Sequence, residues 1–384
     1  MNNIKEKILQ AVTSTQANLY ERQELSKLIW MSIGADLNIL MLGDPGTAKT
    51  MLAVNLTETI KDAKIFRYTL NSFTTIDEIF GHFDLLKLKN NNELRRNITN
   101  KLLDCHIAYL DEFFKSNSGT LNALLDVMNE KAFIDSYGRV ELPLKFLISS
   151  SNELPSEEDN LNAVLDRFQV KYLVKSMQDH SVRINAYLQS GNAMQKITAQ
   201  ITLEDIDLFR AEVAKVQYTT EVAEMTEKIY QSLAKENIFV SDRTIIKSIP
   251  LVKANAFLAG REQVEPSDLI VLKDVFWGEV SDIKPVKKII FELANPLYGK
   301  VEEICESIQE TIEEEEKKIK KSGSDPGEVA NLSFEMVKKM QHASNSIQKI
   351  IKDMENQHIE TYLAKEKVNV LADKISGLFG VSGI

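Results

Sequence analysis

A short apolar run, a glycine-containing loop and a helical pattern follow one another early in this chain, and they constrain its fold more than any other feature. The run NILML, residues 38–42, is too short for a helix and predicts a buried strand. It leads directly into GDPGTAKT, residues 43–50, and a helical pattern begins at Met51. This is the context of a phosphate-binding loop, in which backbone N–H groups at a helix N-terminus hold phosphate oxygens.

The residue types of the loop indicate how it would hold a nucleoside triphosphate. Lys49 would reach the β- and γ-phosphates, and the Thr50 hydroxyl would be a ligand of Mg²⁺. Ala48 stands where Gly usually precedes the Lys, and its methyl group fits if this residue has helical dihedral angles. The alternative is an ordinary tight turn, which the flanking strand and helix disfavour. The predicted ATP- or ADP-binding residues are Gly43, Asp44, Pro45, Gly46, Thr47, Ala48, Lys49 and Thr50.

A second motif ends in two adjacent carboxylates. The stretch CHIAYLDEF, residues 105–113, is an apolar strand that finishes at Asp111 and Glu112. In a parallel sheet these side chains would emerge at the same edge as the loop. Asp111 would then hold Mg²⁺, directly or through water, and Glu112 would polarise the water that attacks the γ-phosphate. Taken alone, the motif is more often a simple strand end, and the loop is what favours the catalytic interpretation.

The first half of the chain alternates strands with helices, which predicts an α/β fold with a parallel five-stranded sheet. Apolar positions at helical spacing predict two helices within residues 4–34. Two insertions, residues 83–98 and 132–144, look like projecting hairpins turned at the Asn90–Asn92 run and at Gly138. Besides residues 38–42, the candidate strands are 65–70, 106–110, 145–149 and 169–174.

The second half reads as helical. Thr202, Ser241 and Ser267 each precede an acidic residue and are predicted helix N-caps. Residues 301–321 form another amphipathic helix, and apolar positions then recur at 3,4 spacing from Val337 through His358 to Phe379, which predicts a helical hairpin or a coiled coil. We therefore divide the chain into an α/β nucleotide-binding domain, an all-α lid domain and a helical C-terminal extension, at residues 1–176, 177–295 and 296–384.

Composition limits the classes of partner and compartment. The 46 basic against 56 acidic residues give a formal charge of -10, which disfavours nucleic acid as the main partner. Cys105 and Cys305 are the only cysteines, so neither a disulfide framework nor a cysteine zinc site is expected. The N-terminus lacks the pattern of a signal peptide, and no apolar stretch is long enough to span a membrane, so we expect a cytoplasmic protein.

Between Leu19 and Trp277 the chain resembles AAA+ ATPases of the MoxR family, and most of all the RavA-like regulatory ATPases. Several motifs in the same order are far more specific than any one of them. Their segments here are LYERQEL, GDPGTAKT, LDEFFKSNSGTLNALLDVMNE, SSSNELP, LDRF and VSDRTIIKSIPLVKANAFLAGREQVEPSDLIVLKDVFW.

This resemblance implies further site residues. Asn152, in SSSNELP, aligns with the sensor 1 residue that orients the attacking water. Arg167, in LDRF, aligns with the arginine finger, and Arg243, in VSDRT, aligns with the sensor 2 arginine of the lid. Tyr20, Glu21 and Arg22 fall where the family frames the adenine. Each of the first three has a structural alternative. Asn152 could be an ordinary turn residue, Arg167 could form a surface ion pair, and Arg243 could form a side-chain pair within its helix.

The resemblance also implies an assembly and a partner. An arginine finger acts in a neighbouring chain, and the family forms hexameric rings that remodel or activate proteins, usually ones with a von Willebrand factor A domain. The two insertions resemble the family's pore or ring-face inserts, whose candidate contact residues here are Phe83, Leu86, Tyr137 and Arg139.

Two other classes of function stay open at this stage. One is an AAA+ motor or loader that acts on nucleic acid, which the acidic balance and the lack of a long basic stripe disfavour. The other is a nucleotide-dependent scaffold with little turnover, which Glu112 disfavours because a pure binder needs no catalytic carboxylate.

Overall fold

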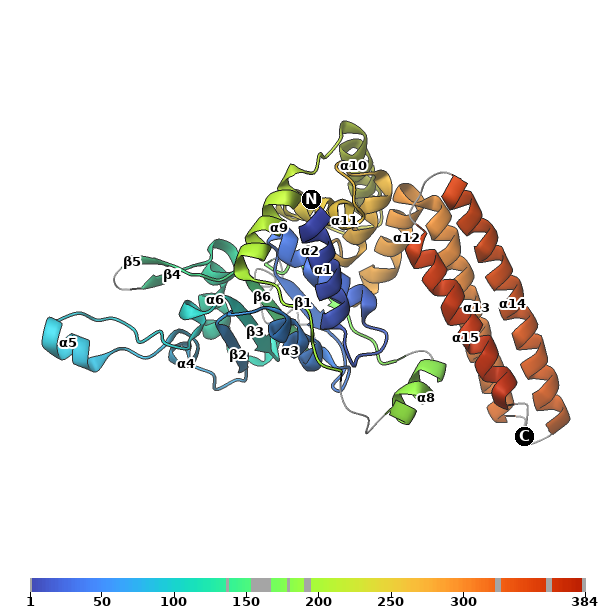
Figure 1. Ribbon diagram of the computed structural model, residues 1–384, viewed down its shortest axis with the longest axis horizontal. Coiled ribbons are helices and arrows are strands. Elements are labelled where there is room, and N and C mark those ends of the chain that lie inside the picture. Colours follow the sequence, from blue (N-terminus) through green and yellow to red (C-terminus); the bar gives the residue numbers. More distant parts are fainter. Residues whose placement is uncertain are drawn as a thin grey trace.

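The molecule extends from an α/β core, through a group of helices, to a three-helix bundle at the other end (Figure 1). No helix in the parts of the chain that the structure describes combines the length and apolar character needed to cross a bilayer. The structure is a computed structural model that describes residues 2–135, 138–152, 167–177, 180–189, 195–321, 326–356 and 361–381.

The core contains the predicted five-stranded parallel sheet, in the order β2-β3-β6-β1-β7. All residues of β1 and β6 are buried, which explains why both segments are apolar or small without alternation. β1 lies between β6 and β7, and β6 separates it from β3. The strands are β1 (Ile39–Leu42), β2 (Ile65–Thr69), β3 (Ile107–Asp111), β6 (Phe146–Ser151) and β7 (Val170–Leu173).

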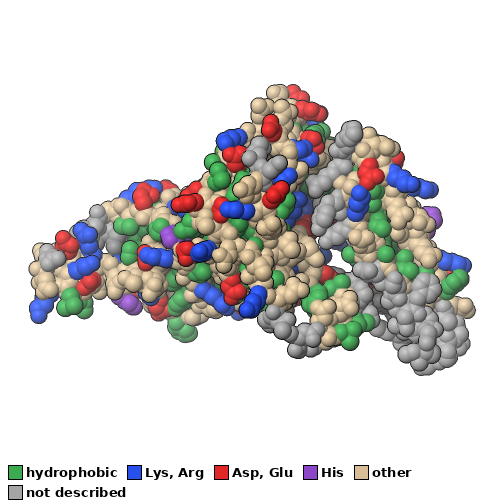
Figure 2. All heavy atoms as spheres, viewed as in Figure 1, with side chains coloured by type: hydrophobic (Ala, Val, Ile, Leu, Met, Phe, Trp, Pro, Cys, Tyr) green, Lys and Arg blue, Asp and Glu red, His purple; other side chains and the backbone are tan. Residues whose placement is uncertain are grey.

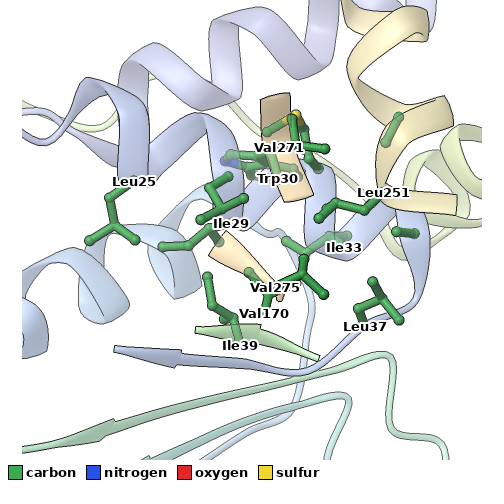
Figure 3. Packing of buried hydrophobic residues seen from close by; sticks show 14 of the residues in the cluster. Leu25, Ile29, Trp30, Ile33, Leu37, Ile39, Val170, Leu251, Val271 and Val275 are labelled. Atoms are coloured by element: carbon green, nitrogen blue, oxygen red, sulfur yellow. The ribbon is translucent and has the colours of Figure 1, made fainter. Parts of the chain in front are cut away.

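Helix α2 packs between the sheet and the helices of residues 203–274. Figure 3 shows Ile29 and Ile33 of α2 between Ile39 of β1 on one side and Leu251 and Val271 on the other. Both predicted N-terminal helices are therefore present, and the second is buried over most of its length. The helical segments of the core are α1 (Asn2–Thr15), α2 (Gln23–Ala35), α3 (Lys49–Thr59), α4 (Ile76–Phe80), η1 (Leu102–Asp104), η2 (Phe113–Lys115) and α6 (Ser118–Glu130).

The second insertion is a β-hairpin, as predicted. β4 (Ala132–Asp135) pairs with β5 (Gly138–Glu141) in antiparallel register, with Asp135 opposite Gly138. Gly138 thus begins the second strand, with a φ of 105°. Tyr137, a candidate contact residue, lies outside the described residues.

The first insertion is an arm with a helical tip, and the predicted hairpin is wrong here. α5 (Leu85–Asn91) occupies the tip, and the two sides of the arm meet at a single bridge between Phe83 and Arg96. Asp84 Oδ1 accepts hydrogen bonds from the backbone N–H groups of Leu86 and Lys87, which caps the helix. The Asn run ends this helix through a left-handed residue at position 92 and does not turn a hairpin.

The middle of the chain is helical, as predicted. Thr202 and Ser241 are the N-caps of α9 and α11. Ser267 is not a cap, because Pro266 begins a 3₁₀-helix whose Asp268 carboxylate accepts from the Glu265 backbone N–H at 2.9 Å. The helices are α8 (His180–Gln189), α9 (Leu203–Lys215), α10 (Thr220–Lys235), α11 (Asp242–Leu258), η4 (Pro266–Asp274), η5 (Val280–Asp282) and α12 (Ile283–Ala294).

The C-terminal region is a bundle of α13 (Pro296–Lys321), α14 (Pro326–Asn356) and α15 (Tyr362–Val381), which pack on one another (Figure 1). The predicted seam holds in α14, where its apolar positions are buried. In α15 the seam holds only in part: the predicted positions Val368 and Ile375 pack against the core, but Lys365 and Ala372 are exposed. Ala364 and Leu371, which were not predicted, are buried there. His358, another predicted seam residue, lies outside the described residues.

A buried carboxylate anchors this bundle to α12. Glu302, in α13, contacts Lys287 Nζ at 2.8 Å, Lys367 Nζ at 3.4 Å and the Tyr298 hydroxyl at 2.7 Å. Burial would raise the pKa of Glu302, but Lys367 and Lys287 outweigh it and lower the pKa to about 2. The carboxylate therefore stays ionised and links α12, α13 and α15.

We expect Glu302→Gln to destabilise the protein by about 1–3 kcal/mol at neutral pH, because two lysines lose their counter-charge. The folded-state pKa lies below the ordinary 4.5, so this stability is present above that pH and is lost as the pH falls toward 2. The difference in Tm between variant and wild type should therefore shrink from neutral pH to about pH 3. Glu303→Gln, at an exposed neighbour, is the control, and a gap that does not depend on pH would contradict the assignment.

Candidate nucleotide site

The sheet order brings the two sequence motifs to one edge. The 43–48 loop leaves the carboxyl end of β1, Asp111 ends β3, and the end of β6 lies between them. Polar side chains that follow parallel strands converge there. Residues far apart in sequence therefore form one candidate site.

Lys49 is the first residue of α3, and its ammonium group points into the loop. Its Nζ donates to the carbonyl oxygens of Gly43 and Asp44, the latter at 2.9 Å, and to Asn152 Oδ1 at 3.1 Å. Burial lowers the pKa of Lys49, while Asp111 and Glu112 act in the opposite direction. The loop thus surrounds a cation at the helix N-terminus, which is the charge pattern that a phosphate group requires.

The backbone of the loop is held in an uncommon conformation. Ala48 has φ 65° and ψ 19°, so the expected right-handed helical dihedral angles are wrong, and an L-residue there costs roughly 1–2 kcal/mol. At Gly43 a Cβ would lie 2.1 Å from the Val174 carbonyl oxygen, so only glycine fits. Thr47 Oγ1 donates to the Asp44 carbonyl at 2.8 Å and closes the turn from inside.

Arg22 supports the loop from behind. Its buried guanidinium donates to the Thr47 carbonyl at 3.0 Å, to that of Lys175 at 2.8 Å and to that of Glu21 at 2.7 Å. These contacts tie the start of α2 and the segment after β7 to the loop. Tyr20, the other predicted adenine contact, donates from its hydroxyl to Gln189 of α8 at 2.9 Å. Arg22 thus lies beside the loop, and the contact of either residue with a base stays a prediction.

Thr50 and Asp111 provide oxygens suited to Mg²⁺. Thr50 Oγ1 lies 3.3 Å from Asp111 Oδ2. Within the described ranges, His, Cys, Asp and Glu side chains form no group of three or more that would hold a metal ion alone. Mg²⁺ does not need such a group, since it is usually held by one or two protein oxygens together with phosphate and water. The two side chains fit that role.

Glu112 sits beside this pair in a left-handed backbone conformation, with φ 53°. Its Oε1 accepts from Asn152 Nδ2 at 2.5 Å. Its buried Oε2 has no hydrogen-bond partner in the described part of the chain, although Lys115 Nζ lies 3.3 Å away. Since Asn152 also contacts Lys49, one amide joins the predicted base to the predicted phosphate-binding lysine.

The two predicted arginines lie elsewhere. Arg243, at the start of α11, donates to Asn129, and the neighbouring Met128 carbonyl accepts from Asn38, at the amino end of β1. Arg167 lies three residues before the amino end of β7 and is half-buried. The loop is at the opposite ends of these strands, about 13 Å away at the usual rise of a four-residue strand. The structure therefore does not bring either arginine to the loop of its own chain.

Sequence comparison decides the family. Residues 6–217 match the family model described as the MoxR domain in the MoxR-vWA-beta-propeller ternary systems, which is more than half of the chain. The chain belongs to the MoxR family. In this MoxR protein, residues 221–290 also match an AAA lid domain. Together with the fold, these matches make it an AAA+ ATPase with an α/β core and a helical lid.

Two relatives from one archaeon are similar in length to this MoxR protein. An uncharacterized protein of Methanocaldococcus jannaschii, MJ0812, is 31% identical over 93% of both chains. A second one from that organism, MJ0079, is 31% identical over 80% of both chains. A crystal structure of a proposed ATPase from Cytophaga hutchinsonii has a TM-score of 0.61, is 18% identical, and covers 76% of this chain and 95% of its own, which supports the fold.

The MoxR site also contains residues that the sequence did not single out. Lys115 lies beside Glu112, and Tyr109 and Ser150 lie behind Asp111. Lys115 follows Glu112 by three residues, a spacing that could have identified it. Tyr109 and Ser150 read as ordinary strand residues, and only the pairing of β3 with β6 brings them together.

Proposed function

We propose that this protein hydrolyses ATP with Mg²⁺, and that it works as a hexameric ring that remodels or activates a protein partner. The observation that carries the proposal is the convergence of Lys49, Asn152 and Glu112 beside the Thr50–Asp111 pair. These are the groups needed to bind a triphosphate and to orient a water molecule at its γ-phosphate.

Each side chain has a distinct task in this proposal. The backbone N–H groups of the loop and Lys49 bind the phosphates, and Thr50 and Asp111 hold Mg²⁺, which supplies neutralising charge. Glu112 orients the attacking water and accepts its proton, while Asn152 fixes the position of that carboxylate. Glu112 Oε2 is buried and has no hydrogen bond within the described residues, although Lys115 Nζ lies 3.3 Å away, and this supports a role as acceptor.

The positions of Arg167 and Arg243 support a site shared between chains. Both lie away from the loop of their own subunit, so a role in hydrolysis requires a neighbour's loop. Arginine suits that role because its planar cation pairs with several phosphate oxygens as charge develops. In a closed ring every site is completed in the same way, because each chain presents one surface to one neighbour and a different surface to the other.

Arg167→Ala should leave ATP binding largely intact and lower hydrolysis by about 10³-fold or more, the usual effect of losing an arginine finger. Mixing it with Lys49→Ala should restore part of the activity, because one variant supplies the loop and the other supplies the arginine. Phosphate release is measured for each variant alone and for mixtures. Mixtures that assemble together but stay inactive would rule out the shared site.

The proposed partner is a protein with a von Willebrand factor A domain. The matching family model describes MoxR domains in systems with such a component, and this motivates the assignment. If a neighbouring reading frame encodes such a domain, its product is the partner to purify together with the ATPase. Co-purification with the ATPase, dependent on ATP, is the expected result, and no binding in either nucleotide state would contradict it.

Several finer assignments belong to the same proposal. The RavA-like subgroup rests on the order of the motifs, and a cytoplasmic location rests on the sequence alone. The domain limits 1–176, 177–295 and 296–384 follow the changes from an α/β core to helices to a bundle (Figure 1).

Figure 2 shows acidic and basic side chains intermingled over the face in view, a pattern that favours a protein partner over a nucleic acid.

A further inference from the structure

A buried hydroxyl chain lies directly behind the Thr50–Asp111 pair. Tyr109, on β3, is 1% exposed, and its hydroxyl lies 2.8 Å from Ser150 Oγ and 3.2 Å from Thr50 Oγ1. Ser150, on β6, is fully buried and donates to Asp111 Oδ1. The Glu112 backbone N–H donates to the same oxygen at 3.0 Å. Asp111 is thus held on the side that faces away from the loop.

Counting the protons gives this chain a direction. Each of the three hydroxyl groups has one hydrogen to donate. Thr50 donates to Asp111 Oδ2 and Ser150 donates to Oδ1, so the single Tyr109 hydrogen is shared between the Ser150 oxygen at 2.8 Å and the Thr50 oxygen at 3.2 Å. In this arrangement Thr50 Oγ1 accepts from Tyr109 and keeps a second lone pair that can face a metal ion. If Tyr109 or Ser150 is lost, the Asp111 carboxylate and the Thr50 hydroxyl lose the contacts that orient them.

We propose that Tyr109 and Ser150 are positioning residues that act through Asp111 and Thr50 and set how tightly the nucleotide site holds Mg²⁺. This inference rests on the proposed function. Hydrogen-bond partners of metal ligands commonly change metal affinity by about 10–100-fold when they are removed. Neither residue reaches the phosphates, so the affinity for nucleotide without metal should change little.

The test compares Tyr109→Phe and Ser150→Ala with Ser149→Ala. Ser149 is the adjacent residue on β6, is equally buried, and has an Oγ with no hydrogen-bond partner in the described residues. A fluorescent ATP analogue is titrated against each protein in EDTA and at increasing free Mg²⁺, and the Mg²⁺ concentration for half-maximal enhancement of binding is measured. We expect this concentration to rise about 10-fold or more for Tyr109→Phe and Ser150→Ala. Ser149→Ala should match the wild type, and Ser150→Thr, which keeps the hydroxyl, should restore most of the Mg²⁺ response.

The outcomes separate this inference from the proposed function. If the wild type shows no Mg²⁺-dependent nucleotide binding, the proposed function itself fails. If the wild type responds to Mg²⁺ and both variants respond identically, only the positioning role is overturned. A parallel loss of binding with and without Mg²⁺ would also overturn it, because that result indicates general damage to the site. Tyr109→Phe removes a single oxygen, so it provides the test even if Ser150→Ala does not fold.

Discussion

Lys49→Ala should abolish measurable ATP binding. The ammonium group bonds to two loop carbonyls and to Asn152, whereas the Arg22 guanidinium contacts the loop only at the Thr47 carbonyl. Removing it leaves those carbonyl oxygens facing the phosphates without a positive charge between them. Because charge-assisted contacts to phosphate are the strongest in such a site, we expect an affinity loss of about 100-fold or more. Isothermal titration calorimetry with ATP and Mg²⁺ measures the effect.

The control for this variant is Lys61→Ala, at an exposed lysine just beyond the end of α3. It should bind ATP as the wild type does, and both variants should keep a cooperative thermal transition. Retained micromolar affinity in Lys49→Ala would mean that the 43–50 segment is not the phosphate-binding loop.

Glu112→Gln should bind ATP normally and lose turnover by about 10²–10⁴-fold, the usual contribution of a general base. The amide keeps an oxygen that accepts from Asn152, so the side chain should stay in place. It cannot take a proton from water, however, and Lys115 loses its carboxylate partner. Single-turnover measurements of phosphate release separate the chemical step from product release.

Glu58→Gln, at an exposed glutamate of α3, is the matched control and should hydrolyse ATP at the wild-type rate. Near-normal hydrolysis by Glu112→Gln would remove Glu112 from the proposed role. Because that variant should hold ATP without consuming it, it is also the form in which the oligomeric state with bound ATP is best measured.

β1, β3 and β6 could be predicted because burial on both faces imposes a short run of apolar or small residues. β2 is an edge strand with three exposed residues, so burial does not explain its pattern. The arm at residues 83–98 could not be predicted. Its leucines and lysines fit an alternating strand pattern, and the decisive signal was the cap at Asp84, which is local chemistry and not periodicity. The heptad seam holds in α14 but only in part in α15, since spacing alone does not show where one helix ends and the next begins.

For the site, the motif residues were predictable because parallel strands deliver their ends to one edge. Ala48 was misjudged since its left-handed conformation is imposed by the surrounding loop and not by its own preference. Arg22 was assigned to the base by resemblance, whereas the structure shows it bonded to three backbone carbonyls. The positions of Arg167 and Arg243 depend on tertiary packing, which a sequence pattern does not encode.

The arm with α5 and the three-helix bundle project from opposite ends of the long axis of the molecule (Figure 1). Leu85 and Leu86 at the tip of the arm are 72% and 71% exposed. The arm and the bundle are therefore separate parts of the surface, so a variant in one leaves the surface of the other unchanged. Deleting one projection would leave the other end accessible, so the ends can be dissected one at a time.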